Sequence, residues 1–316
     1  MTLDKVIMQR LAFDKYLYKS AVEQSQKAEP FCASSILAFH DPIELFLQIS
    51  LEHLNVTTKE EPSFMGYWDL LNGGITGKGL KGELTQRESM RRLNRARVAL
   101  KHHGTLPSRL DIEAFRSTAT NFLSENTTTI FGIDFSSISL IEIVQNQKAR
   151  EDLRQAEEKA REGDIRGALS QIAIAFRKLI DDYEHEGRDK FGRSPFFFGE
   201  SMSFLDGSSV VGSGFGALSK LHDFVDHTAK SVKALQDALK ILSLGIDYRR
   251  YARFQLLTPH VTPIPGGPYY TDDRMEGSMN QPTQDDVQFC IDFVIESAVT
   301  LQEFPYGVHH SKTTQY

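Results

Sequence analysis

The residues with the clearest chemical potential lie in the segment RARVALKHHG, in which arginines precede a histidine. Arg97 and His102 have four residues between them, and Arg95 and His102 have six. A histidine can take the proton from a ribose 2′-hydroxyl, and an arginine can hold the scissile phosphate through two parallel hydrogen bonds. This spacing fits cleavage of RNA by attack of the 2′-hydroxyl on the phosphate, which leaves 2′,3′-cyclic phosphate ends.

The surrounding segment, residues 84–103, is a strongly basic stretch in an acidic protein. Its basic side chains are Arg87, Arg91, Arg92, Arg95, Arg97 and Lys101, and Glu88 is its only acid. The segment therefore carries a net charge of about +5, whereas the 316-residue chain has a formal net charge of −6. Such a surface attracts a polyanion, so Arg91, Arg92 and Lys101 are expected to contact RNA. The alternative is a solvated helix face whose cations pair with acids of a neighbouring helix.

The helical period separates these basic residues into two sets. If Leu93 points to the core, Arg91, Arg95 and His102 form one polar stripe on the opposite side of the helix. Arg97 lies nearer the buried edge. If the helix stays regular to His102, the wheel favours Arg95 over Arg97 as the partner of His102, and both arginines are kept as candidates.

Most of the chain is predicted to be helical, because apolar residues recur with the 3.6-residue period. The expected helices span residues 4–26, 31–54, 84–103, 108–126, 145–161, 168–184, 217–257 and 284–304. Thr85 and Glu88 have the spacing of a capping box at the start of the basic helix, and the glycines of residues 73–82 indicate a loop. Residues 247–253, DYRRYAR, fit either single-stranded nucleic acid or an interface of arginine–carboxylate pairs. No long stretch alternates with the period of a strand, so the predicted fold class is all-α.

Two domains are expected, a helical bundle over residues 1–145 and a helical region over residues 146–316. The second region begins with the pattern AEEKAREGDIRGALSQIAIAFRKLI, which is typical of one tetratricopeptide-like hairpin, although no repeat follows it. A Gly/Phe-rich loop is expected at residues 191–216. This C-terminal half is the part expected to bind a partner protein.

Composition excludes several classes of protein. The cysteines, Cys32 and Cys290, are too few for a disulfide framework and are expected to be reduced thiols of a cytoplasmic protein. No signal peptide and no apolar run of about 18 residues is visible, so no membrane contact is expected. His40 and Glu44 are four residues apart, but no further ligand type joins them, so we expect neither a metal nor a cofactor.

The N-terminal half resembles the HEPN superfamily, whose members are helical bundles with an arginine, four to six residues and a histidine on a late helix. The segment AFHDPIELFLQISLEHL is also similar to the second HEPN helix, where an acidic residue helps to form the site; Glu44 is the matching residue. The resemblance covers about residues 1–145. It implies a homodimer through the N-terminal bundle, with a metal-independent endoribonuclease site in the dimer cleft, as in toxins and antiviral defence proteins.

One departure from the family pattern keeps a second function open. The residue after the arginine is usually small and polar in the family, but Val98 follows Arg97 and Ala96 follows Arg95. The alternative is therefore a non-catalytic dimerisation or binding subunit that docks a partner protein or nucleic acid.

Overall fold

The computed structural model describes residues 3–187, 194–196, 198–199, 216–264, 267–272 and 281–304. Of the described residues, 72% are helical, and their only sheet has two short strands. This confirms the mostly helical class that the sequence predicts. The chain divides into two units, Met1–Ile143 and Val144–Tyr316, near the predicted boundary at residue 145. Each unit is described by itself below.

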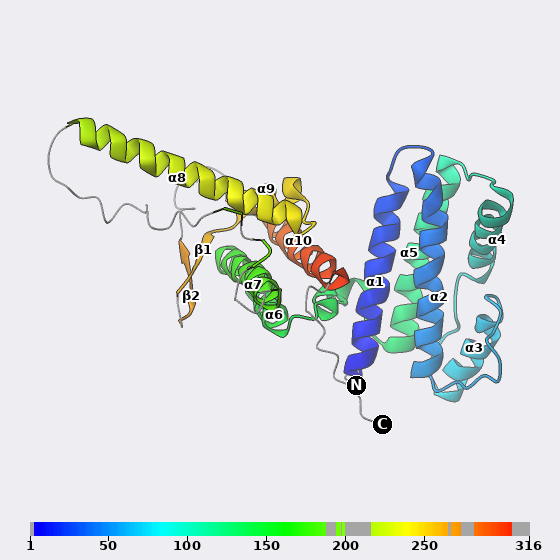
Figure 1. The fold of residues 1–316 in the computed structure, drawn as a ribbon. Coiled ribbons are helices and arrows are strands. Elements are labelled where there is room, and N and C mark those ends of the chain that lie inside the picture. The colour runs from blue at the N-terminus through cyan, green and yellow to red at the C-terminus, as the bar shows by residue number, and fades with distance from the viewer. Residues whose placement is uncertain are drawn as a thin grey trace, which may run out of the picture. The chain divides into compact units, whose positions relative to one another are not determined.

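Unit 1 is built from five α-helices and three short 3₁₀ segments within its described residues. These elements are α1 (Lys5–Ser25), η1 (Phe31–Ser34), α2 (Ser35–His53), α3 (Tyr67–Gly77), α4 (Arg87–His103), α5 (Arg109–Phe131), η2 (Phe135–Ser137) and η3 (Leu140–Ile143). Figure 1 shows α1, α2 and α5 as long neighbouring helices, with α4 beside α2. Because α2 contacts α1, α3, α4 and α5, it is the central helix of the unit.

The sequence of α2 explains its central position. Ile36, Phe39, Ile43 and Leu47 recur at helical spacing and are fully buried. Pro42 lies inside the helix, and a single helix continues across it rather than ending at that point. On the neighbouring α1, the carboxyl group of Asp14 is fully buried without a hydrogen-bond partner among the described residues, and burial raises its pKa well above 3.8.

The prediction of a glycine-rich loop over residues 73–82 is wrong for the first half of that range. Gly73, Gly74 and Gly77 belong to α3 instead. A Cβ atom at Gly74 would lie only 2.6 Å from a side-chain carbon of Val56. This glycine therefore serves close packing of the helix rather than a turn.

The predicted capping box at the start of α4 is also wrong. The N-cap is Gln86, which has a positive φ of 62° and makes no side-chain capping bond. Thr85 instead donates its hydroxyl hydrogen bond to Glu125 at 2.6 Å, and its backbone N–H bonds to Asn126 at 3.0 Å. Side chains of α5 thus hold the start of α4, which a local pattern cannot show.

Unit 2 begins with a helical hairpin and continues with three further helices and a β-hairpin within its described residues. Its elements are α6 (Gln147–Arg161), α7 (Ile165–Glu186), α8 (Gly216–Ser243), α9 (Tyr248–Leu257), β1 (His260–Pro263), β2 (Tyr269–Asp272) and α10 (Gln284–Glu303). Figure 1 shows α6 and α7 packed side by side, as expected for a hairpin. Gly163 forms the turn between them with a φ of 86°.

Two features of unit 2 differ from the sequence prediction. The helix expected over residues 217–257 is divided into α8 and α9, because Gly245 adopts a φ of 72° and Asp247 caps the start of α9. The antiparallel strands β1 and β2 were not expected, since each has only four residues. Most of the loop predicted at residues 191–216 lies outside the described residues.

Two of the sequence-based expectations concern membrane-spanning helices and the state of the two cysteines. Within the described residues, no helix combines the length and the apolar character needed to cross a bilayer. Cys32 and Cys290 are both free and buried.

Candidate nucleic-acid interface

Helix α4 carries the basic surface of unit 1 and is held by its apolar side. Met90 and Leu93 are fully buried, and the helix packs on α2 and α5. Gly104 ends the helix in the left-handed conformation, with its N–H bonded to the carbonyl of Leu100. Lys101 lies in the last turn, next to the negative end of the helix dipole. This interaction between the positive charge and the dipole stabilises the end of the helix.

The ion pairs of α4 leave most of its charge uncompensated. Arg87 pairs with Asp69 at 3.1 Å, and Arg91 pairs with Glu88 of the same helix at 2.8 Å. Four cations have no carboxylate within 4 Å in the part of the chain that the structure describes: Arg92, Arg95, Arg97 and Lys101. The alternative that acids of a neighbouring helix neutralise this surface therefore holds for only one of its six cations, Arg87.

The structure separates the predicted catalytic arginines between two faces of α4. Arg97 is half-buried on the side of α4 that faces α2, where its charge and that of Lys101 act on His40 and Asp41. Arg95 is exposed on the other face. This agrees with the helical wheel, which places Arg97 near the buried edge.

His102 is exposed at the end of α4 and lies apart from this buried edge. On a regular helix, Arg97 and His102 project about 140° apart and are separated by about 7.5 Å along the axis. Arg95 and His102 are two turns apart on one stripe, separated by about 10.5 Å. The arginine and the histidine of one chain therefore diverge.

His40 is the residue that links the predicted acid Glu44 to Arg97. Its ring is 2% exposed and stacks on Phe64 with centroids 4.5 Å apart, and its Nδ1 lies 3.5 Å from the Glu44 carboxylate. Burial and then the charge of Arg97 lower the pKa of His40 to about 4, while the side chain of Asn94 opposes the shift. His40 is therefore neutral at pH 7 and is a weak base.

A carboxylate of α2 also senses the basic helix. Desolvation raises the pKa of Asp41, and the charges of Arg97 and Lys101 oppose that rise. Within the described residues, no group of three or more histidine, cysteine or carboxylate side chains has the arrangement of a metal site. The His40–Glu44 spacing, visible in the sequence, is thus a contact next to Arg97, a relation that the sequence alone did not reveal.

Comparisons with protein-family models, with curated proteins and with solved structures found no match for this chain.

Proposed function

We propose that unit 1 binds RNA along α4 and cleaves it as a HEPN-like, metal-independent endoribonuclease of the kind found in toxins and antiviral defence. The observation that carries this proposal is the uncompensated charge of the four α4 cations, Arg92, Arg95, Arg97 and Lys101. Positive charge without an internal partner is stabilised by a polyanion, and each phosphate contact releases counterions.

The chemistry requires a base and a cation at the same phosphate. His102 is the proposed base for the ribose 2′-hydroxyl, because its imidazole is exposed and a substrate can reach it. Arg97 is proposed to stabilise the negative charge that develops on the phosphate in the transition state. Glu44 is the proposed positioning residue, because its carboxylate lies 3.5 Å from Nδ1 of His40, a side chain whose pKa responds to the charge of Arg97.

The divergence of Arg97 and His102 on one helix makes dimerisation part of the proposal. Two copies of α4 that face each other would bring Arg97 of one chain to His102 of the other. The homodimer through the N-terminal bundle, which the HEPN resemblance implies, supplies such an arrangement. Arg95, on the same stripe as His102, is the competing partner within one chain.

The primary test is cleavage of single-stranded RNA by the full chain in EDTA. We expect 2′,3′-cyclic phosphate products, a loss of about 10²–10⁴-fold in rate for His102→Ala, and a comparable loss for Arg97→Ala. Arg97→Lys should not rescue fully, because lysine lacks the planar fork of arginine. Arg95→Ala tests the competing pairing. Loss of cleavage in EDTA would show that the metal-independent mechanism is wrong.

A mixing experiment tests the contribution of two chains to one site. Arg97→Ala and His102→Ala proteins, each inactive alone, should regain activity when unfolded and refolded together, because a mixed dimer contains one intact pair. No recovery in a dimer shown to be mixed would assign both groups to one chain.

A non-catalytic RNA-binding subunit is the second candidate, and one observation favours it. On one copy of α4, Arg97 and His102 project about 140° apart, so a single chain does not bring the two groups to one phosphate. Val98 in place of a small polar residue agrees with this reading. The second unit would then dock a partner protein. Salt-dependent RNA binding without cleavage, by a protein shown to be dimeric, would establish this function instead of the first.

A further inference from the structure

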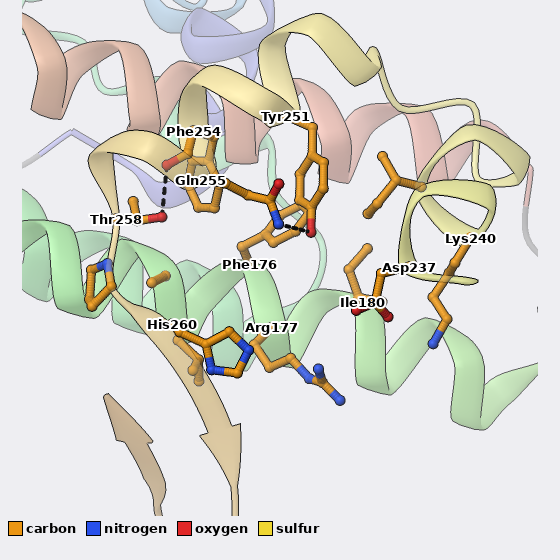
Figure 2. Close-up of a pocket in the computed structure, with 14 residues that line it drawn as sticks. Phe176, Arg177, Ile180, Asp237, Lys240, Tyr251, Phe254, Gln255, Thr258 and His260 are labelled. Carbon is orange, nitrogen blue, oxygen red and sulfur yellow. Dashed lines mark hydrogen bonds between the residues drawn. The ribbon is translucent and has the colours of Figure 1, made fainter. Parts of the chain in front are cut away.

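Unit 2 contains a pocket between α7, α8, α9 and the start of β1 (Figure 2). Its volume is about 230 Å³. Because most pockets for drug-sized ligands occupy roughly 300–1,000 Å³, this one suits a smaller molecule. All of its lining residues belong to unit 2, so it is independent of the α4 surface.

One wall of the pocket is aromatic. The ring of Phe176 lies 5.1 Å from that of Phe254 and 5.8 Å from that of Tyr251, measured between centroids. Figure 2 shows the Tyr251 hydroxyl pointing from α9 toward α7, beside the amide of Gln255. Gln255 donates a hydrogen bond to that oxygen at 2.9 Å, so the tyrosine hydrogen remains available to another acceptor.

The charges at the pocket are mostly paired, and the remainder is negative. Arg177 pairs with Asp181 at 2.9 Å, and Lys240 pairs with Glu184 at 2.6 Å. A further carboxylate lines the pocket, that of Asp237, and it has no cation within 4 Å among the described residues.

The shift in the pKa of Tyr251 also indicates that the net charge near this part of the pocket is negative. Burial and then the charge of Asp237 raise the pKa of Tyr251 to about 12, and Arg177 opposes this rise with a smaller effect. The net field at this hydroxyl is therefore negative, and the phenol stays protonated at neutral pH.

We propose that this pocket binds a small organic ammonium ion. Its apolar body would pack on Phe176, Tyr251 and Phe254, and its ammonium group would lie at Asp237. Aromatic faces attract a cation, and the unpaired carboxylate adds a directional charge-assisted bond. An anion would find both lining cations, Arg177 and Lys240, already paired with carboxylates, and a neutral molecule would leave Asp237 without a partner.

Three probes of almost equal shape test the sign of charge that the pocket selects. They are phenethylamine, 2-phenylethanol and phenylacetate, which are positive, neutral and negative at pH 7. Calorimetric titration of the full chain should show phenethylamine binding at least tenfold more tightly than 2-phenylethanol, with phenylacetate weakest. Equal binding of the first two, preference for phenylacetate, or no binding of phenethylamine would each overturn the proposal.

A matched pair of variants on α8 tests the assigned carboxylate. Asp237→Asn should weaken phenethylamine about tenfold and leave 2-phenylethanol unchanged. Asp226→Asn is the control, because Asp226 pairs with Lys230 and does not line the pocket. Asp237 is exposed, so its substitution is not expected to unfold the protein. An unchanged affinity in Asp237→Asn would place the ammonium elsewhere and refute the assignment.

Discussion

Helices α4 and α9 are both rich in arginine, but two arginines of α9 form ion pairs with α10, whereas most cations of α4 have no carboxylate partner among the described residues. In α9, Arg250 forms an ion pair with Glu296 of α10, and Arg253 lies 3.4 Å from Asp286. The guanidinium of Arg253 also lies over the ring of Phe289, 4.0 Å from its centroid. In α4, four of six cations lack such a partner among the described residues.

This difference separates two uses of arginine. The α9 residues of the DYRRYAR segment hold α9 to α10, so the interface reading of that segment fits the structure better than the nucleic-acid reading. Arg92, Arg95, Arg97 and Lys101 of α4 repel one another and form no ion pair among the described residues. A helix that keeps such charges uncompensated is the one expected to meet an external polyanion.

The largest expected effect comes from removing the uncompensated charge. Changing Arg92, Arg95, Arg97 and Lys101 together to Gln should weaken binding to single-stranded RNA on the order of a hundredfold at 0.1 M salt. The slope of log affinity against log salt should become shallower by about 3, since each phosphate contact contributes about 0.7. Fluorescence anisotropy with a labelled RNA measures both quantities.

The matched control for that variant changes arginines of α9. The triple substitution of Arg249, Arg250 and Arg253 to Gln should leave the RNA affinity and its salt slope within twofold of the wild type. If the α9 and α4 variants weakened RNA binding equally, the absence of ion pairs in α4 would not explain RNA binding, and the proposed role of α4 would be contradicted.

The next effect concerns the stability of unit 1 at low pH. His40 has a folded-state pKa of about 4 against 6.5 when unfolded, so the unfolded chain binds more protons between these values. The contribution of His40 to the free energy of unfolding is fully present above pH 6.5 and is lost as pH falls, by about 3 kcal/mol between pH 7 and pH 4. The buried Asp14, whose pKa is raised, contributes in the opposite direction. Trp68, the only tryptophan and fully buried in unit 1, can report urea unfolding of this unit.

A variant assigns that loss to His40. His40→Gln should flatten the dependence on pH, whereas the exposed His103→Gln should leave it unchanged. If His40→Gln loses as much stability on acidification as the wild type, another group is responsible.

A smaller effect is expected at the paired arginines of α9. Arg250→Gln should reduce the local stability of α9 and α10 by about 1 kcal/mol, because the pair with Glu296 is partly exposed. Hydrogen exchange of the α10 amides measures this change. The exposed Arg249, which has no ion pair among the described residues, provides the control Arg249→Gln with no expected change.

The smallest effect tests the contact between α4 and α2 directly. Arg97→Gln should raise the pKa of His40, because the nearby cation disfavours the protonated imidazole. Arg95→Gln, on the other face of α4, should not move it. NMR titration of the His40 ring measures both, and an equal shift in the two variants would contradict the assigned faces.

The sequence by itself determined the features that depend on local periodicity. The stripe of Ile36, Phe39, Ile43 and Leu47 predicts a buried helix, and the structure places α2 at the centre of unit 1. The helical wheel also predicts that Arg97 lies nearer the core than Arg95. These inferences succeed because residues three or four positions apart share one helix face whatever the rest of the fold does.

Only the tertiary structure decided how the charges and the turns are used. Arg250 of α9 forms an ion pair because the carboxylate of Glu296, distant in sequence, reaches it. Arg92, Arg95 and Arg97 of α4 meet no such carboxylate among the described residues. Residue 74 of α3 is a glycine because Val56 leaves no room for a side chain, and the start of α4 depends on Glu125 of α5. The physical reason is that burial and ion pairing are set by neighbours in space, and local spacing carries no information about which distant residues those neighbours are.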